Sequence, residues 1–410
     1  MSIPSVTENA LGYKFDWSDE QITILVNRLK QHNDGRLNGE IVITTAAPGY
    51  EPHLHQAAFN FTSSGARGKL AKDMKTRLDL DWDSILEQLS VLTLRRFRAG
   101  TPVETIWPAT EEIKPPAYLV DPLVIQHYPS IIFGDPSSGK STLAQMMICL
   151  LTLPWWDNPL GLTVTNKSHE CIVFDYETDR DTVSWQLACI IRGMGLPEFG
   201  FHYRRCFLPL ADDIDEALKA IESTNAKVII IDSLGPACGG ELNEAKPALA
   251  LFGALRRLNR TAFILAHNSK STEGKGKSIY GSIFFLALAR SVWEIKKVQS
   301  ADADEIEVGL FHRKPPPFAK LHKPLGFKFS FDGDKTVINV QDPKTVGEFL
   351  QQMGTQQRIY ELLKSGAMSP KEISENLEIS SGDVRTTLFR MKSKNKVIKI
   401  GENYGLVNEL

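Results

Sequence analysis

Residues 131–142 read IIFGDPSSGKST, an apolar run that leads into a glycine-rich loop. From Gly134 to Ser141 the loop fits the pattern G-x-x-x-x-G-K-[ST], with an apolar strand predicted before it and a helix after it. In that context the backbone N–H groups of the loop and the N-terminus of the helix point at phosphate oxygens. A chance match rarely has both flanking elements, so the stretch predicts a phosphate-binding loop.

The loop residues have distinct predicted roles towards ATP and Mg²⁺, the two cofactors that the motif implies. Lys140 is expected to reach the β- and γ-phosphates, and the hydroxyl of Ser141 to bind Mg²⁺. The predicted ATP-binding residues are Gly134, Asp135, Pro136, Ser137, Ser138, Gly139, Lys140, Ser141 and Thr142.

A second Mg²⁺ ligand is predicted in residues 227–233, which read KVIIIDS. Asp232 ends a buried strand there, about ninety residues after Lys140. An aspartate at the end of a strand often caps only the next turn. Its pairing with a phosphate-binding loop favours the Walker B role instead.

ATP hydrolysis also needs an acid that orients water. Ser233 follows Asp232, so the glutamate that many ATPases carry beside the Walker B aspartate is absent. The sequence CIVFDYETD, residues 171–179, offers Glu177 with Asp175 as its rival. We favour Glu177 because it follows the apolar run and belongs at the carboxyl edge of the sheet, where ligands bind in open α/β folds. A solvated acid at the strand end is the alternative for either residue.

Two further polar residues border apolar segments. His267 ends the strand TAFILAH and is expected to contact the γ-phosphate, although a lone histidine is more often only a hydrogen-bonding group. Arg290 lies in the apolar run FFLALARSVWEI, where a charge needs an anionic partner. An ATP bound to a neighbouring subunit is one such partner, and a salt bridge within the monomer is the other.

Three regions are predicted: an N-terminal α+β accessory domain over residues 1–115, an ATPase domain over 116–345 and a winged helix-turn-helix over 355–410. In the middle region short β-branched strands alternate with helical segments, which indicates a parallel sheet with helices on both faces. Later strands at 305–314 and 324–333 are expected to extend it in antiparallel fashion. For the first region we predict an amphipathic helix at 19–31, strands at 39–46 and 53–61, a polar helix at 62–78 and a linker at 111–122.

The motifs VFDYETD, IIIDSLGPACGGELNE, LAHNSK and YGSIFFLALAR resemble the RecA-like ATPases, specifically the RepA branch of hexameric replicative helicases. The resemblance covers residues 118–300. It implies a RecA-like α/β fold, a homo-hexamer with single-stranded DNA in its ring, and ATP hydrolysis at subunit interfaces. Glu177 would be the water-activating acid, Asp232 the Walker B acid and His267 the sensor, with Arg290 as the finger supplied in trans. The N-terminal region and the C-terminal winged helix depart from the minimal family pattern.

Two basic segments predict contact with DNA. The loop SKSTEGKGKSIYGS after His267 is either a DNA-contacting loop or an ordinary solvated one. In the C-terminal region no acidic residue occurs from Arg385 to Ile400, so a recognition helix at 380–392 and a wing hairpin at 394–406 would present a basic face to duplex DNA. Leu388, Phe389 and Met391 are expected in its core or at the core edge. The predicted DNA-binding residues are Lys270, Lys275, Lys277, Arg385, Arg390, Lys392, Lys394 and Lys396.

Composition excludes several classes of protein. With a net charge of -2 and 23% charged residues, the chain of 410 residues is not a wholly basic nucleic-acid coat protein. The five cysteines form no CxxC pair, and for the three in apolar stretches we expect buried free thiols. We find neither a run of eighteen apolar residues nor a signal-peptide pattern, and expect a protein of a bacterial or phage-infected cytoplasm with no membrane partner.

The leading hypothesis is a DNA-dependent ATPase, an oligomeric helicase or translocase of DNA replication or repair. One alternative is a recombination mediator of the RecA/Rad51 type, which coats single strands as a filament. Another is a nucleotide-gated DNA-binding regulator or helicase loader. A small-molecule kinase ranks last because no arginine-bearing lid over an acceptor site is recognisable.

Overall fold

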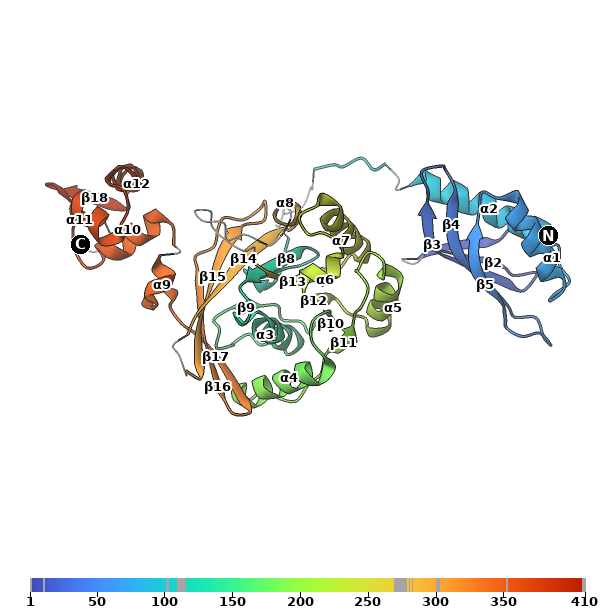
Figure 1. Cartoon of the computed structure of the whole chain (residues 1–410), viewed down its shortest axis with the longest axis horizontal. Coiled ribbons are helices and arrows are strands. Elements are labelled where there is room, and N and C mark those ends of the chain that lie inside the picture. Colours follow the sequence, from blue (N-terminus) through green and yellow to red (C-terminus); the bar gives the residue numbers. More distant parts are fainter. Residues whose placement is uncertain are drawn as a thin grey trace. The chain divides into compact units, whose positions relative to one another are not determined.

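A computed structural model of the chain describes residues 2–9, 12–100, 103–108, 116–268, 279, 281, 283–299, 303–351 and 353–407. The chain divides into a compact unit of residues 1–114 with 213–223 and a second unit of residues 115–212 with 224–410. Figure 1 labels the helices and strands.

The N-terminal residues form an antiparallel meander that is packed on two helices. The strand order is β1 (Ser5–Asn9), β2 (Gly12–Trp17), β3 (Ile22–Gln31), β4 (Leu37–Thr45) and β5 (His53–Asn60). Helices α1 (Ser64–Lys75) and α2 (Trp82–Ala99) follow, and one apolar core joins the strands to them. Its largest fully buried side chains include Trp17, Trp82, Phe15 and Phe61.

The helix predicted at 19–31 is wrong, because this segment is the strand β3. Every second side chain, at Ile22, Ile24 and Val26, is buried, which is the period of a strand with one face on a core. The two predicted strands and the polar helix do occur, as β4, β5 and α1.

The central sheet has the strand order β11-β10-β12-β13-β8-β14-β15-β16-β17. The strands from β11 to β14 are parallel to their neighbours, and β15, β16 and β17 extend the sheet as antiparallel strands. This arrangement agrees with the predicted α/β class. The bounds are β8 (Pro129–Gly134), β10 (Cys171–Asp175), β11 (His202–Arg205), β12 (Val228–Asp232), β13 (Thr261–His267), β14 (Ser291–Val298), β15 (Glu305–Lys314), β16 (Leu325–Asp332) and β17 (Lys335–Val340).

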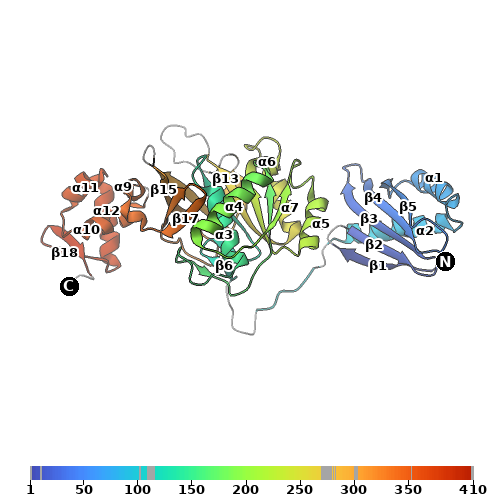
Figure 2. The same ribbon diagram turned by 90° about the horizontal axis from the view of Figure 1, so that it is seen from below.

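Helices cover both faces of the parallel part. In Figure 1, α3 (Lys140–Thr152) and α4 (Arg180–Met194) lie on one face, and α6 (Leu234–Cys238) and α7 (Ala245–Leu258) lie on the other. Short helices α5 (Ile214–Thr224) and α8 (Ile283–Leu288) complete the connections. Figure 2 gives the same elements after a quarter turn.

A small sheet precedes the central one, in the order β7 (Val124–Ile125), β6 (Tyr118–Asp121) and β9 (Thr163–Val164). The predicted linker at 111–122 is therefore wrong for its second half, since 118–121 form a paired strand. The apolar side chains of Leu119 and Val120 are buried in the core and outweigh the flanking prolines.

The C-terminal residues have a core of their own. After η1 (Pro343–Thr345) and α9 (Gly347–Leu350) come three helices, α10 (Thr355–Leu363), α11 (Pro370–Leu377) and α12 (Ser381–Ser393), and a hairpin of β18 (Val397–Ile400) and β19 (Asn403–Leu406). A capping box between Ser369 and Glu372, with Pro370 at the first turn, begins α11. The core contains Ile359, Leu363, Ile373, Val384, Leu388, Met391, Val397 and Leu406.

Two general expectations can be compared with this fold. Buried free thiols are predicted for the three cysteines in apolar stretches, and all five cysteines are free and buried. In the described parts of the chain no helix combines the length and the apolar character that a membrane span requires.

Candidate functional site

The glycine-rich loop connects β8 to α3, and two of its glycines are required by their surroundings. A Cβ on Gly134 would lie 2.4 Å from Cγ2 of Ile295, on the adjacent strand β14. Gly139 caps α3 with φ +86°, and a Cβ there would lie 2.8 Å from the ring of Phe329. Only glycine tolerates such a close approach together with a left-handed backbone. The loop is thus fitted against the strands beside it.

Polar groups in the loop are arranged for an anion. The Nζ atom of Lys140 donates to the backbone oxygens of Gly134, at 3.1 Å, and Asp135, at 2.7 Å. Burial lowers the pKa of this ammonium group, a shift that a phosphate beside it would oppose. The Oγ atom of Ser138, in a side chain that is 1% exposed, has no hydrogen-bond partner among the described residues. A phosphate oxygen would satisfy it.

Ser141 and Asp232 meet at the start of α3. The Ser141 hydroxyl donates a hydrogen bond of 2.8 Å to Oδ2 of Asp232. Burial, reinforced by the charges of Glu177 and Asp175, raises the pKa of Asp232 to about 6. A cation would relieve that cost, so the two oxygens suit Mg²⁺. The described residues contain no cluster of three or more His, Cys, Asp or Glu side chains that could hold a metal.

Glu177 and Asp175 occupy different environments. Asp175 ends β10, is 1% exposed, and accepts hydrogen bonds from the N–H groups of Glu177 and Thr178 and from the hydroxyls of Thr178 and Tyr203. Burial alone would raise the pKa of Asp175, but these hydrogen bonds outweigh it and lower that pKa. Asp175 therefore organises the turn, while Glu177 extends beyond it into the cleft.

The Glu177 carboxylate is held by residues from two neighbouring strands. Its Oε1 atom accepts a hydrogen bond from the hydroxyl of Ser233 and lies 3.2 Å from Nε2 of His267. These residues follow or end β10, β12 and β13, which are adjacent in the parallel sheet. The structure thus brings the predicted acid and the predicted sensor together at the carboxyl edge of the sheet.

A cleft of about 480 Å³ joins these groups to the phosphate-binding loop. It is open to solvent, and the antiparallel extension of the sheet supplies part of its wall. Its lining consists of Pro136, Ser137, Ser138, Gly139, Lys140, Ser141, Thr142, Glu177, Gln186, Asp232, His267, Lys297, Gln299, Ile306 and Phe331.

Comparisons with known proteins agree with this geometry. A family described as an AAA domain matches residues 93–273, which include the loop, Glu177, Asp232 and His267. Over these residues the chain is similar to P-loop ATPases of the AAA type. No curated protein matches the chain. Among similar solved structures is a KaiC-like protein from the hyperthermophilic archaeon Pyrococcus horikoshii OT3, with 15% identity, 55% of this chain and 94% of that chain covered, and a TM-score of 0.37.

Arg290 lies away from the P-loop of its own ATPase domain. Its N–H group donates to the oxygen of Pro129, at the first residue of β8, and its exposed guanidinium lies 5.5 Å from the centre of the Tyr128 ring. The P-loop begins at the opposite end of β8, roughly 17 Å along the strand. The sequence left two partners open for Arg290, an ATP of a neighbouring subunit and a salt bridge within the monomer. Among the described residues Arg290 forms no such salt bridge.

The segment before Arg290 is anchored by a lysine. The Nζ atom of Lys314 donates to the backbone oxygens of Leu286, Ala287 and Ala289, at 2.7 to 2.8 Å. Burial, and then the charge of Arg290, lower the pKa of this lysine. Lys314 thus fixes the C-terminal end of α8 just before Arg290.

The predicted DNA-binding residues fall into two groups. Lys270, Lys275 and Lys277 lie outside the described residues. The remaining five are all exposed, on α12 or in the turn before β18; they are Arg385, Arg390, Lys392, Lys394 and Lys396.

One residue of α12 departs from its prediction. Leu388 and Met391 are fully buried as expected, but Phe389 is 72% exposed. Three and four residues separate the buried positions along the helix, which leaves Phe389 on the opposite face together with Arg385. The expectation of a core-edge role for Phe389 is wrong, and its ring is part of the basic face.

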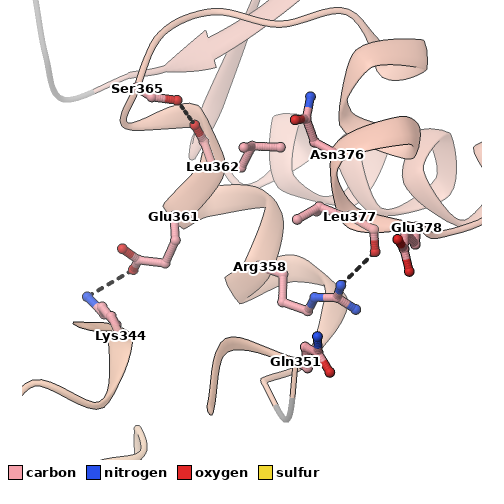
Figure 3. A pocket seen from close by; sticks show the side chains of 9 residues that line it. All are labelled: Lys344, Gln351, Arg358, Glu361, Leu362, Ser365, Asn376, Leu377 and Glu378. Carbon is pink, nitrogen blue, oxygen red and sulfur yellow. Dashed lines mark hydrogen bonds and ion pairs between the residues drawn. The ribbon is translucent and has the colours of Figure 1, made fainter. Parts of the chain in front are cut away.

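A second cleft, of about 520 Å³, lies in the C-terminal part of the chain (Figure 3). Its basic side chains are already engaged: Lys344 pairs with Glu361 at 2.9 Å, and the Arg358 guanidinium donates to the oxygen of Leu377 at 2.6 Å. Of these two clefts, the ATPase cleft, although slightly smaller, holds the phosphate-binding loop with the unpartnered hydroxyl of Ser138. We therefore place the nucleotide there.

The sequence did not reveal several residues of the ATPase cleft. In the sequence, Ser233 is notable only because many ATPases have a glutamate at this position, beside the Walker B aspartate. In the structure its hydroxyl contacts Glu177. Lys297 comes from the parallel strand β14 and Phe331 from β16 of the antiparallel extension, both far from the P-loop along the chain. The alternating phenylalanines of GFKFSFDG are the only signal in the sequence for Phe331.

Proposed function

We propose that this protein is a DNA-dependent ATPase that acts as an oligomeric helicase or translocase in DNA replication or repair. The observation that carries the hydrolytic part is the position of Glu177, which lies in the same cleft as Lys140 and the Ser141–Asp232 pair. A domain that only bound nucleotide would not need a carboxylate oriented by Ser233 and His267 at that point.

In the proposed reaction, Glu177 orients a water molecule for attack on the γ-phosphate and accepts its proton. General-base assistance of this kind contributes about 10²- to 10⁴-fold to a rate. Lys140 leaves its loop carbonyls and stabilises the charge on the β- and γ-phosphates. When bound, Mg²⁺ neutralises phosphate charge, and Ser141 and Asp232 are its proposed protein ligands.

The proposed catalytic unit is an oligomer, a hexamer in the family that the chain resembles. Arg290 is exposed and stacked on Tyr128 at the edge of the sheet that lies opposite its own P-loop. This position is distant from its own P-loop, and the proposed anionic partner of Arg290 is the ATP of another subunit. An arginine supplied in trans stabilises the transferring phosphoryl group, and it makes turnover depend on assembly.

The DNA part of the proposal rests on the C-terminal residues. We assign them a winged-helix role, with α12 in the major groove and the β18–β19 hairpin as the wing. The exposed cations of α12 meet phosphates, and no acidic residue from 385 to 400 opposes them. Single-stranded DNA would contact the ring, where the predicted lysine loop follows His267.

A regulator or helicase loader is the second candidate. The observation that favours it is the separate apolar core of the C-terminal residues, which makes their basic face independent of the ATPase cleft. In that case hydrolysis would reset a DNA-bound state and would not drive unwinding.

The deciding experiment measures ATPase rate and strand displacement, each with and without single-stranded DNA at low salt. A motor is expected to show DNA-stimulated turnover and ATP-dependent displacement, both absent in Glu177→Gln. A loader is expected to bind DNA more tightly as Glu177→Gln with ATP, without displacement by the wild type. Turnover that does not respond to DNA across low salt contradicts both.

A further inference from the structure

Strand β16 carries a row of phenylalanines that ends in the ATPase cleft. Phe327, Phe329 and Phe331 occupy every second position, so they share one face of the strand. Phe327 and Phe329 are 1% and 0% exposed, whereas Phe331 is 36% exposed. The row therefore begins in the core and ends with one ring at the surface.

The exposed ring stands beside the P-loop. Phe329 packs directly under Gly139, and Cδ1 of Ile306 lies 3.4 Å from the position of a Cβ on that glycine. Phe331 is two residues further along β16, about 6 to 7 Å at the rise of a strand. It lines the same cleft as Ser141 and Thr142. In the strand order, β16 lies on the far side of β8 from β12 and β13, whose ends carry Ser233 and His267 beside Glu177.

The backbone around Phe331 is fixed. Its residue pairs with Thr336 across the β16–β17 hairpin, and its N–H group donates to the oxygen of Asp304 at 2.7 Å. A large apolar ring on a rigid element, partly exposed beside a phosphate cradle, offers an uncovered apolar face to a ligand in the cleft. Its flat face matches a nucleobase, which every nucleotide presents at the end opposite its phosphates.

We propose that Phe331 is the stacking platform for the base of the bound nucleotide. This inference rests on the proposed function, because it assumes that a nucleoside triphosphate occupies the P-loop. Stacking on an aromatic ring tolerates every base. Among the described lining residues, the Gln299 amide is able to read a base edge, but its oxygen accepts from Lys297 and its nitrogen donates to the oxygen of Ala303. The site therefore accepts adenine and guanine with little discrimination.

The test separates the base from the phosphates. Binding of a non-hydrolysable ATP analogue and of inorganic triphosphate is measured by calorimetry for wild type, Phe331→Ala and Phe331→Tyr. Phe331→Ala is expected to lose about tenfold or more in affinity for the ATP analogue and nothing for triphosphate. Phe331→Tyr keeps both affinities. Phe318→Ala is the matched control, since that ring is also 36% exposed but does not line the cleft.

Three results would overturn the inference. Unchanged affinity of Phe331→Ala for the ATP analogue would show that the ring does not bind the base. An equal loss of affinity for triphosphate would show that the ring only supports the phosphate-binding loop. If the wild type binds the ATP analogue more than about a hundredfold more tightly than its guanine counterpart, the inferred low selectivity for the base is wrong. If the wild type binds neither ligand, the proposed function fails and takes this inference with it.

Discussion

The Nε2 atom of His267 lies 3.2 Å from Oε1 of Glu177, and the same oxygen accepts a hydrogen bond from Ser233. The three residues come from the ends of adjacent parallel strands, so any movement of the carboxylate reaches β13 directly. The chain continues from His267 towards the predicted DNA loop and then to α8 and Arg290. The contact between Glu177 and His267 thus links the residue proposed to orient water to the segment expected to meet DNA and the neighbouring ATP.

The first prediction concerns hydrolysis. Glu177→Gln is expected to lower kcat by about 10²- to 10⁴-fold, because the amide keeps the shape of the side chain but cannot accept a proton. ATP affinity should stay close to that of the wild type, as measured by calorimetry beside a phosphate-release assay. Asp175→Asn is the contrasting variant: it breaks a buried hydrogen-bond set and should lower the unfolding midpoint. Substantial turnover by Glu177→Gln would show that another residue is the general base.

The second prediction concerns the shared site. Arg290→Ala and Lys140→Ala are each expected to abolish DNA-stimulated turnover, for different reasons. Mixed in equal amounts, the two variants should recover activity, because about one in four interfaces of a random ring pairs an intact P-loop with an intact finger. A phosphate-release assay across mixing ratios measures this recovery.

The control for that experiment is Arg192→Ala, which removes an exposed arginine of α4 that pairs with Asp334 at 2.6 Å. It should turn over normally and should not alter the complementation. Normal activity of Arg290→Ala by itself, or no recovery on mixing proteins that still assemble, would contradict a finger supplied in trans.

The third prediction concerns acid stability and rests on a buried histidine of β15. His312 is 8% exposed, stacks on Trp293 with ring centres 4.2 Å apart, and accepts a hydrogen bond from the N–H group of His322. Burial, helped by the neighbouring His322, lowers the pKa of His312 from 6.5 to about 4. The folded protein therefore keeps the ring neutral, while the unfolded chain takes up a proton below about pH 6.5.

The contribution of the neutral His312 ring to the free energy of unfolding is fully present above pH 6.5 and is lost as the pH falls towards 4. Its size is at most about 3 kcal/mol. In His312→Gln the unfolding midpoint should be lower at pH 7 because the ring no longer packs on Trp293, but should fall less between pH 7 and pH 4.5 than in the wild type. Urea unfolding at both pH values measures the difference. An unchanged pH dependence in His312→Gln would contradict the assignment.

The sequence was most informative where structure is local. The P-loop, its flanking strand and helix, and Asp232 at the end of β12 all follow from short-range patterns. The segment 22–29 misled because its apolar residues satisfy both a helical and a strand period, and only the neighbouring strands β2 and β4 settle the choice. Asp175 and Glu177 could not be separated by alternation, since their difference is one of burial.

Phe331 could not be assigned for a different reason. The register of β15 against β16 and the packing of Phe329 under Gly139 place it in the cleft, and the second of these contacts joins segments far apart in the chain. A ring at a strand end is ordinary in the sequence alone. Only the folded position beside Gly139 makes it a candidate for ligand contact.

The last prediction concerns the basic face of α12. Replacing Arg385, Arg390 and Lys392 by alanine should weaken binding to duplex DNA and flatten the slope of log affinity against log salt by about one for each phosphate that the protein no longer neutralises. Phe389→Ala should weaken binding without changing that slope, because its ring carries no charge. Fluorescence anisotropy at a series of salt concentrations measures both quantities. All four side chains are exposed, so the unfolding midpoint should change little. Removing Lys69, Lys72 and Lys75 from α1 takes away the same charge elsewhere, and an equal effect on the slope would assign the binding to net charge and not to α12.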